Sequence, residues 1–386
     1  MKKHILILGC KNYPAFYSKK VISGGMEVYV TEIISYLKKD FRFTVIAGYS
    51  NSDDVDVRVR SVPLIGKFAL QPISLSFYSF FIAIWQVIRG TRYDLVNAQT
   101  PLSGLVGYVL KKWFGIPYIV TVHIFAATHA HVGWAASIYG HVEKLVLHHA
   151  DKVLSAGYEL KKYLDTRYDF KDGHVMVLHP GMDVVSFDET SVSNDLREKL
   201  KADTYKILFM GRLIEENGVK DLLEAIRRMK GEDFKLYFAG NGNLEKLISG
   251  FIEKEKLHDK VLLLGVIRGP DKQFLIRNVD LSIRTSYHEV FPVAYLESVS
   301  VGVPVIATPV GDTEYMAERT DAITVVPVND PESVVSAIRD QMRKGPLPEE
   351  SVMKAQSFID SISWEKQSLQ TKDVFNGIMK VTDNKN

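Results

Sequence analysis

The sequence predicts an α/β protein built on two open, mostly parallel sheets, and three observations support this. The chain has 386 residues, which exceeds one ordinary domain and suggests two. Short runs rich in Val, Ile and Leu recur with little alternation, as in strands that helices cover on both faces. Amphipathic helical patterns separate these runs, which is typical of parallel sheets built from right-handed crossovers.

The predicted elements follow each other in a regular order. The first half contains the strand runs His4–Leu8, Phe43–Ala47, Leu95–Ala98, Tyr118–Val122, Lys152–Ser155 and Val175–Leu178. The second half contains Lys206–Phe209, Lys235–Phe238, Lys260–Leu264, Leu281–Ile283, Pro304–Ala307 and Ala322–Val326. Helical spacing of apolar residues is clear in Val28–Lys38 and Asp221–Met229.

The pattern restarts once, after a polar stretch, and this restart sets the expected domains. Residues 1–185 form an N-terminal domain, residues 186–203 a linker, and residues 204–348 a second domain. Residues 349–386 are expected to be helices that pack back toward the N-terminal domain. Two open α/β sheets that face each other leave a cleft between their strand carboxyl ends, where ligands bind.

Composition narrows the functional classes. The chain is 46% hydrophobic and 24% charged, as globular proteins are, and its net charge of +2 argues against a nucleic-acid partner. The single cysteine, Cys10, excludes a disulfide framework and a cysteine-based metal site. It is expected to be a small buried hydrophobe. The first apolar run is too short for a signal peptide, so we expect a cytoplasmic location.

One uncharged segment, from Phe68 to Ile88, is long enough to cross a bilayer. Several polar residues and Pro72 interrupt its hydrophobicity. A membrane span here would also separate the strand run His4–Leu8 from the sheet to which it is assigned. We therefore expect a buried or interfacial helix, with a membrane span as the alternative.

The most informative stretch runs from Tyr287 to Glu297 and holds two glutamates separated by seven residues. Pro292 stands between them and suits the first position of a helix. Glu289 would then lie in the loop before the helix, and Glu297 about a turn and a half into it. The free amides of a first helical turn bind anions such as a diphosphate. Two surface glutamates at an ordinary helix start are the alternative.

Strand runs that end in glycine accompany this stretch. The run Ile207–Met210 is followed by Gly211-Arg212, and an arginine at the carboxyl end of a strand can offer phosphate a fork of donors. Asn217-Gly218-Val219-Lys220 then opens the next helix. Two further runs lead into glycine loops expected at the same sheet edge, and these loops contain Gly240, Gly242 and Val266.

In this order and spacing the motifs resemble the GT-B retaining glycosyltransferases of family 4, over nearly the whole chain. The resemblance is strongest at Gly211–Lys220, Gly240–Gly242, Glu289–Glu297 and Gly302–Gly311. It implies the GT-B fold, with two Rossmann-like doubly wound domains that face a central cleft. It also implies a site for a nucleotide-diphosphate sugar, the donor, in the C-terminal domain.

The resemblance assigns roles to particular residues. Glu289 would hold hydroxyls of the transferred sugar, Glu297 would hold the ribose, and Arg212 with the amides near Val290–Ala294 would grip the diphosphate. Catalytic roles are implied for Glu289, Arg212 and His123. The implied donor-binding residues are Gly24, Gly25, Arg212, Lys220, Gly240, Gly242, Val266, Glu289, Val290, Phe291, Pro292, Val293 and Glu297.

The N-terminal half contributes two matching features. Gly24-Gly25 resembles the family's glycine loop, whose backbone approaches the donor phosphates, although a glycine pair alone indicates only a turn. His123 follows a strand run and in the family lies near the sugar and the acceptor; a structural histidine is the alternative. His129 and His131 fall in the expected acceptor loop and are interpreted as solvated rather than metal-binding.

Two positions depart from the family pattern. Asn217 stands where the family usually has a lysine that binds phosphate, and Lys220 lies three residues further on. Whether Lys220 substitutes for that lysine is left open. Asn97-Ala98-Gln99 stands where the family often has histidines.

The expected reaction moves a hexosyl group from the donor to a glycan or a lipid-linked acceptor by front-face displacement, without a metal or cofactor. Asp54-Val55-Asp56 is interpreted as solvated charge, since it lies in a polar loop and not at a strand end. The segment Leu110–Phe114 mixes basic and aromatic residues, as membrane-surface helices do. Peripheral contact with the inner face of the cell membrane is a hypothesis, and a core helix with a solvated lysine face is an equally open alternative. A nucleotide-sugar epimerase or hydrolase and a non-catalytic nucleotide-sugar-binding subunit are the alternative functions.

Overall fold

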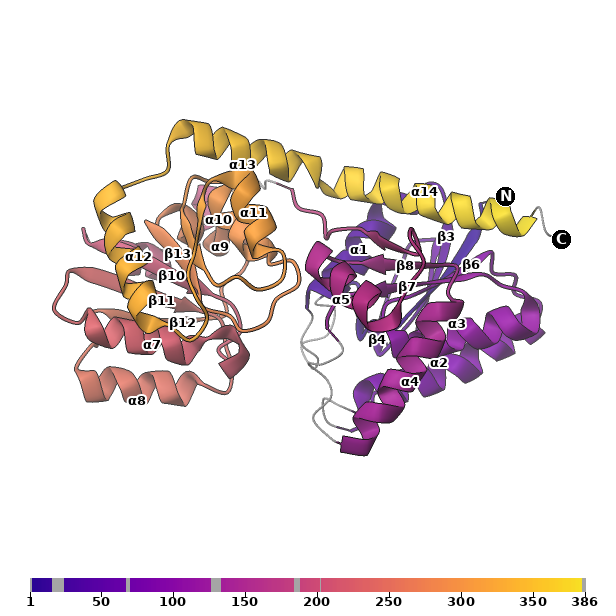
Figure 1. Ribbon diagram of the computed structural model, residues 1–386. Coiled ribbons are helices and arrows are strands. Elements are labelled where there is room, and N and C mark those ends of the chain that lie inside the picture. Colours follow the sequence, from indigo (N-terminus) through magenta and orange to yellow (C-terminus); the bar gives the residue numbers. More distant parts are fainter. Residues whose placement is uncertain are drawn as a thin grey trace. The chain divides into compact units, whose positions relative to one another are not determined.

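The computed structural model describes residues 2–15, 24–66, 70–125, 133–183, 188–201 and 203–383, except for the side chains of residues 133–138 and 383. The chain forms two units (Figure 1). Unit 1 comprises Met1–Gly181 and Ile362–Asn386, and unit 2 comprises Met182–Ser361. Each unit is an α/β structure with its own parallel sheet, as the sequence predicts.

The sheet of unit 1 contains every strand run predicted in this half of the chain. Among the described residues its parallel strands follow the order β5-β3-β1-β6-β7-β8-β9. Strand β5, in which Arg58 and Arg60 alternate with valines at the edge of the sheet, was not predicted from the sequence. The bounds are β1 (His4–Leu8), β3 (Arg42–Ala47), β5 (Val57–Ser61), β6 (Leu95–Ala98), β7 (Tyr118–Val122), β8 (Lys152–Ser155) and β9 (Val175–Val177), with β2 (Asn12–Tyr13) and β4 (Tyr49–Ser50) paired separately.

Helices cover this sheet on both faces. On one face, Ile33 of α1 and Phe375 of α14 belong to the same buried cluster as Ile5 and Phe43 of the sheet. On the other face, α3 packs against β6 and β7, and α2 and α4 pack against α3. The bounds are α1 (Gly25–Leu37), α2 (Gln71–Ile88), α3 (Pro101–Phe114), α4 (Gly133–His149), α5 (Tyr158–Tyr168) and α14 (Trp364–Asp383).

Helix α2 is long and apolar enough to cross a membrane by length and composition. The sheet excludes such a span in this fold. Strand β1, which precedes α2 in the sequence, pairs with β6, which follows it. The helix instead packs along α3 at the surface of unit 1 and is mostly exposed, so it is not the buried helix that the sequence suggested, and an interfacial helix stays a prediction.

The sheet of unit 2 reverses its strand order at its centre. Its parallel strands follow the order β12-β11-β10-β13-β14-β15, so β10 and β13 are neighbours and the chain leaves them in opposite directions. Ligands of open α/β sheets bind at such a switch point, outside the strand carboxyl ends. The bounds are β10 (Tyr205–Met210), β11 (Phe234–Ala239), β12 (Val261–Gly265), β13 (Leu281–Arg284), β14 (Val305–Ala307) and β15 (Ile323–Val325).

Helices also cover both faces of the second sheet. One buried cluster joins its strands to α7, α8 and α12, and another joins them to α6 and α9. Helix α10 packs beside α9, and α13 packs against α10 and α11. The bounds are α7 (Val219–Arg228), α8 (Glu245–Glu255), α9 (Gly269–Arg277), α10 (Val293–Val299), α11 (Thr313–Thr320), α12 (Pro331–Lys344) and α13 (Glu349–Ser361).

The segment predicted as a linker, residues 186–203, differs from that prediction. It contains a 3-10 turn, η2 (Glu189–Ser191), and a short helix, α6 (Asn194–Leu200). Val192, Leu196 and Leu200 are buried against α9 and belong to the core of unit 2. Their four-residue spacing marks one helix face, which the charged residues between them obscured. Residues 184–187 and 202 lie outside the described ranges.

The predicted C-terminal helices divide between the two units. Helix α13 belongs to unit 2, where it packs against α10 and α11. Helix α14 belongs to unit 1 and packs against α1. The division falls at the short break between Ser361 and Trp364.

Candidate functional site

The loops after β10, β11 and β13 join one another at the carboxyl edge of the unit 2 sheet. The N–H of Leu213 donates to the carbonyl of Asn241 at 2.8 Å. The N–H of Tyr287 donates to the carbonyl of Glu216, also at 2.8 Å. These bonds connect segments far apart in the sequence, so the loops form one backbone framework around the switch point.

Glycine is required where these backbones meet. A Cβ atom on Gly218, whose φ is +68°, would lie 1.7 Å from the carbonyl oxygen of Thr285. A Cβ atom on Gly240 would lie 1.8 Å from the carbonyl oxygen of Gly211, and Gly242 is confined in the same way. No side chain fits at these distances. The predicted glycine loops therefore hold the edge of the sheet together, whatever they also contact in a ligand.

Glu289 is held by a buried arginine that the sequence analysis missed. Arg284, the last residue of β13, is 8% exposed. One of its terminal nitrogens donates to Glu289 Oε1 at 2.6 Å, and the other donates to the carbonyl of Met210 at 2.6 Å. Ser286 Oγ also donates to Glu289 Oε1, at 3.1 Å. The loop carboxylate is thus fixed in position by the two central strands.

The space for Arg284 comes from Gly211. A Cβ atom on Gly211 would lie 2.3 Å from an Arg284 terminal nitrogen. The guanidinium carbon lies 5.4 Å from the centre of the Phe209 ring, within cation–π range. Removal of one partner of a buried ion pair leaves the other charge uncompensated, at a cost of about 3–5 kcal/mol. Arg284 is a charged residue that directly follows the apolar run Leu281–Ile283, and this was the signal that could have identified it.

Glu297 also has a cationic partner. Lys272 of α9 approaches Glu297 Oε1 with its Nζ atom at 2.5 Å, and both side chains are partly exposed. Because a carboxylate has two oxygens, this contact leaves Oε2 available to accept from a ligand hydroxyl. Nothing in the sequence pattern singled out Lys272, since the two residues come from different helices.

The helix after Glu289 begins one residue later than predicted. Pro292 is the N-cap residue, with φ −78° and ψ 84°, and α10 starts at Val293. Glu297 is accordingly the fifth helical residue. The N–H of Val293 donates to the carbonyl of Phe291 at 3.0 Å, and the carbonyl of Val290 accepts from the N–H of Asp312 at 2.9 Å. The grip of these backbone groups on a diphosphate stays a prediction.

Arg212 and the residues near it have distinct environments. Arg212 is exposed beyond the end of β10. The buried Asn217, which replaces the family's lysine, donates through Nδ2 to the carbonyl of Arg212 at 2.7 Å. Asn217 thus supports the loop that carries Arg212. Lys220 is exposed, in the first turn of α7, and pairs with Glu215 at 2.7 Å. Val266, in the loop after β12, is also exposed.

The glycine pair predicted in the N-terminal half lies at the start of α1. Gly24 is the N-cap residue and Gly25 is the first helical residue. The buried Glu27 carboxylate accepts from the N–H of Gly24 at 2.8 Å and from the N–H of Lys11 at 3.3 Å. Glu27 therefore ties the helix start to the segment after β1. Residues 16–23, which precede the glycines, lie outside the described ranges.

His123 follows β7 in unit 1 and is partly buried. Its Nε2 lies 3.0 Å from Gln99 Oε1, within hydrogen-bond distance. The ring contacts Tyr29 edge-on, with the ring centres 5.1 Å apart. Burial lowers the pKa of His123 to about 4, so the ring is neutral near pH 7. His129 and His131 lie outside the described residues.

Within the described ranges, no three side chains among His, Cys, Asp and Glu are placed to hold a metal ion together. The structure therefore offers no candidate cation site among these residues. Metal-independent transfer stays a prediction, which a chelator experiment tests.

Two protein-family models match the chain. The model described as Glycosyl transferases group 1 matches residues 192–358, which include the loops of the unit 2 site. The model described as Glycosyltransferase Family 4 matches residues 23–185. Together the two matches cover most of both units.

Similar proteins agree with these models. An uncharacterized glycosyltransferase of Methanocaldococcus jannaschii is 23% identical over 305 residues, which cover 75% of this chain and 77% of that protein. A D-inositol 3-phosphate glycosyltransferase of Salinispora tropica is 24% identical over 395 residues, covering 92% of this chain and 81% of that protein.

Solved structures share the fold. A sucrose-phosphate synthase from Thermosynechococcus elongatus superimposes with a TM-score of 0.77 at 19% identity, over 99% of this chain and 100% of that one. The Anabaena protein HepE in complex with UDP superimposes with a TM-score of 0.74 at 17% identity, over 98% of this chain and 100% of that one. The chain therefore belongs to the group 1 glycosyltransferases, enzymes with the GT-B fold.

Proposed function

We propose that this enzyme is a retaining hexosyltransferase whose nucleotide-sugar donor binds at the carboxyl edge of the unit 2 sheet. The observation that carries the proposal is the Arg284–Glu289 pair at the switch point between β10 and β13. It holds a carboxylate where open α/β sheets bind ligands. HepE has been solved with UDP and with UDP-glucose, which makes these the first donors to test.

In this proposal the two glutamates position the donor. Glu289 accepts hydroxyls of the transferred sugar, and its fixed orientation lowers the entropic cost of placing them. Glu297 accepts from the ribose through Oε2, because Lys272 contacts Oε1. A catalytic role for His123 belongs to the same proposal, in which its ring acts in the neutral form.

Arg212 and Lys220 provide positive charge for the diphosphate. The bond between the sugar and the diphosphate breaks, and a bond from the acceptor oxygen forms on the same face of the sugar. The acceptor proton passes to the departing diphosphate oxygen, so the protein needs no nucleophile. Charge that grows on the diphosphate is stabilised by Arg212, and the variant Arg212→Ala should lose about 2–4 kcal/mol of barrier reduction, a fall of about 30- to 10³-fold in kcat.

A donor screen tests the site. Thermal shift and hydrolysis are measured with a panel of nucleoside diphosphates and their sugars, for the wild type and for Glu297→Ala. We expect one donor to stabilise the wild type and to lose that effect in the variant. The exposed Glu253→Ala serves as a control, since it lies on α8 away from the loops. If nothing in the panel shifts the wild type, the donor site is wrongly assigned.

Product analysis tests the reaction. With donor and acceptor present, NMR of the first product formed should show the anomeric configuration of the donor, and inversion would refute a retaining mechanism. A donor that is rearranged or hydrolysed without transfer to any acceptor would favour the epimerase or hydrolase alternative.

Activity should persist in EDTA, and its loss would refute metal independence. A glycan or lipid-linked acceptor and a cytoplasmic location belong to the same proposal.

A further inference from the structure

Helix α2 exposes its large apolar side chains and buries smaller or polar ones, which is the reverse of what a solvated surface helix does. Its buried residues are Leu75, Ser79, Ala83 and Gln86, of which two are polar and one is small. Its exposed face carries the large apolar side chains. These are Ile73, Phe77, Phe81, Trp85 and Ile88, which are 54% to 71% exposed.

The exposed side chains form one continuous line. Their spacing of four, four, four and three residues keeps them on one face of the helix from end to end. The rings of Phe77 and Phe81 contact each other, with centres 5.0 Å apart. A surface helix of a soluble protein normally presents charged and polar residues on this face. The line therefore marks a face that is suited to an apolar environment.

The apolar surface continues onto α3, which packs beside α2 (Figure 1). Trp113, near the end of α3, is 61% exposed, and its ring lies 6.4 Å from that of Phe80. Phe114 follows and is also exposed. We call the surface formed by Ile73, Phe77, Phe81, Trp85, Ile88 and Trp113 the aromatic stripe.

Basic residues border the aromatic stripe, and neither α2 nor α3 contains an aspartate or glutamate. Arg89 is exposed at the end of α2, with its guanidinium carbon 4.8 Å from the centre of the Trp85 ring. Arg92 is exposed shortly after the end of α2, and Lys112 is exposed in the last turn of α3. Aromatic rings with cationic side chains at their border are typical of helices that lie in the headgroup region of an anionic membrane.

We propose that the aromatic stripe is a membrane-docking surface, with α2 lying in the plane of an anionic lipid bilayer. The rings enter the boundary between headgroups and acyl chains, while Arg89, Arg92 and Lys112 contact the lipid phosphates. Pairing of β1 with β6 keeps α2 on the surface of unit 1, so it binds the membrane without crossing it. This inference concerns unit 1 and does not depend on the donor chemistry of unit 2.

Flotation of the full-length protein with lipid vesicles tests the proposal. We expect the wild type to float with phosphatidylcholine vesicles that contain phosphatidylglycerol, and to float less as salt is raised. The variant Phe77→Ser/Phe81→Ser/Trp85→Ser should bind at least about tenfold more weakly, since each ring removed takes apolar area from the interface. The control Leu247→Ser/Met353→Ser/Leu369→Ser, which changes exposed apolar residues elsewhere, should float as the wild type does.

A charge variant tests the basic border. Arg89→Glu/Lys112→Glu should reduce flotation with anionic vesicles, whereas Lys246→Glu/Lys254→Glu, on the exposed surface of α8, should not. Unfolding midpoints of all variants should stay near that of the wild type, because every altered side chain is exposed. Failure of the wild type to float at low salt, or undiminished flotation of the triple ring variant, would overturn the proposal. A concentration-dependent dimer that the ring variant abolishes, without any vesicle binding, would also overturn it and assign the surface to a second copy.

Discussion

Helices α2 and α7 both cover a parallel sheet, but their outward faces have opposite chemistry. Helix α7 buries Val219, Leu222, Leu223, Ala225 and Ile226 against its sheet. Helix α2 buries a smaller and more polar set and exposes its large apolar side chains. The two helices therefore divide their residues in opposite ways, although both lie at the surface of a unit.

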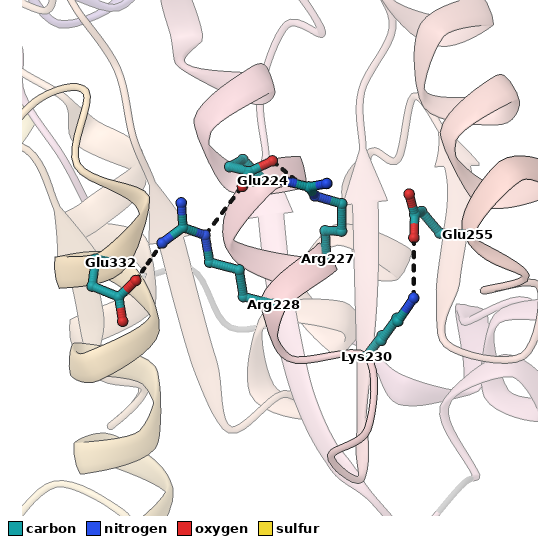
Figure 2. Close-up of polar contacts among 6 residues, drawn as sticks. All are labelled: Glu224, Arg227, Arg228, Lys230, Glu255 and Glu332. Carbon is teal, nitrogen blue, oxygen red and sulfur yellow. Dashed lines mark hydrogen bonds and ion pairs between the residues drawn. The ribbon is translucent and has the colours of Figure 1, made fainter.

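The outward face of α7 is covered by ion pairs (Figure 2). Glu224 accepts from Arg227 at 2.7 Å and from Arg228 at 3.1 Å, and Arg228 also pairs with Glu332 of α12. Beyond the helix, Lys230 pairs with Glu255 at 3.5 Å. Such a face is stable in water. The comparison shows that unit 2 presents an ordinary solvated surface here, whereas unit 1 presents a surface suited to an apolar contact.

The largest expected effect comes from a substitution that disrupts the glycine contacts at the carboxyl edge of the unit 2 sheet. Gly218→Ala places a side chain at φ +68° and against the Thr285 carbonyl, so it should destabilise unit 2 by about 3–5 kcal/mol through backbone strain and overpacking. The four tryptophans, Trp85, Trp113, Trp134 and Trp364, all belong to unit 1. The midpoint of urea unfolding measured by circular dichroism should therefore fall, whereas the midpoint measured by tryptophan emission should fall less.

The control for this prediction is Gly250→Ala. Gly250 is an exposed residue within α8 with open space around its Cα atom, so alanine should stabilise the protein by about 0.5–1 kcal/mol. Equal stability of the two variants would refute the role assigned to the glycine contacts.

The second prediction concerns the ion pair inside unit 2. Glu289→Ala leaves Arg284 buried without its partner and should cost about 3–5 kcal/mol of unfolding free energy, measured by urea denaturation. The double variant Arg284→Met/Glu289→Met should regain most of that stability and remain inactive. Recovery of activity together with stability would show that the pair acts only through the fold.

The third prediction concerns acid and probes unit 1. Burial lowers the pKa of His4 and of His123 to about 4, against about 6.5 in the unfolded chain. Both rings bind protons more readily in the unfolded chain. Their contribution to the free energy of unfolding is therefore complete above pH 6.5 and is lost as the pH falls toward 4. For each ring, the free energy of unfolding of unit 1 should fall by at most about 3 kcal/mol between pH 6.5 and pH 4.

Tryptophan emission during urea unfolding at pH 7 and pH 5 measures this effect, because it reports on unit 1. The variant His4→Asn should flatten the pH dependence, and an unchanged profile would argue against its assigned pKa. His4 is preferred to His123 for this test, because it is buried beside Thr44 and lies outside the predicted site, so its substitution should change stability without changing the site.

The smallest effect is expected on the surface of α7. Glu224→Ala removes the shared partner of Arg227 and Arg228 and should cost less than about 1 kcal/mol, because exposed ion pairs contribute little. Urea denaturation at low salt measures it. A cost as large as that of Glu289→Ala would contradict the distinction between exposed and buried pairs.

Much of the fold could be predicted from the sequence. Strands covered on both faces leave continuous apolar runs, so β1, β10 and the other central strands were found from composition and position. The edge strand β5 was missed because its alternating arginines face solvent. The helix α6 was missed because charged residues surround its buried Leu196 and Leu200.

The candidate site could be proposed from the sequence where one short segment carries it. Glu289 and Glu297 belong to a single stretch, and the glycines end predicted strands, so both follow from local sequence. Arg284 and Lys272 could not be assigned in the same way, since their partners are defined by how β13 and α9 pack.

The sequence by itself determined the alternation of strands and helices, the family and the apolar content of α2. Only the tertiary structure decided which side of α2 faces the protein, because a helix that is apolar around much of its surface can pack through either face. In α2, which packs against α3, Ser79 and Ala83 are buried, and Phe77, Phe81 and Trp85 are exposed. Small side chains allow the two helices a close approach, so the large rings are left on the outside.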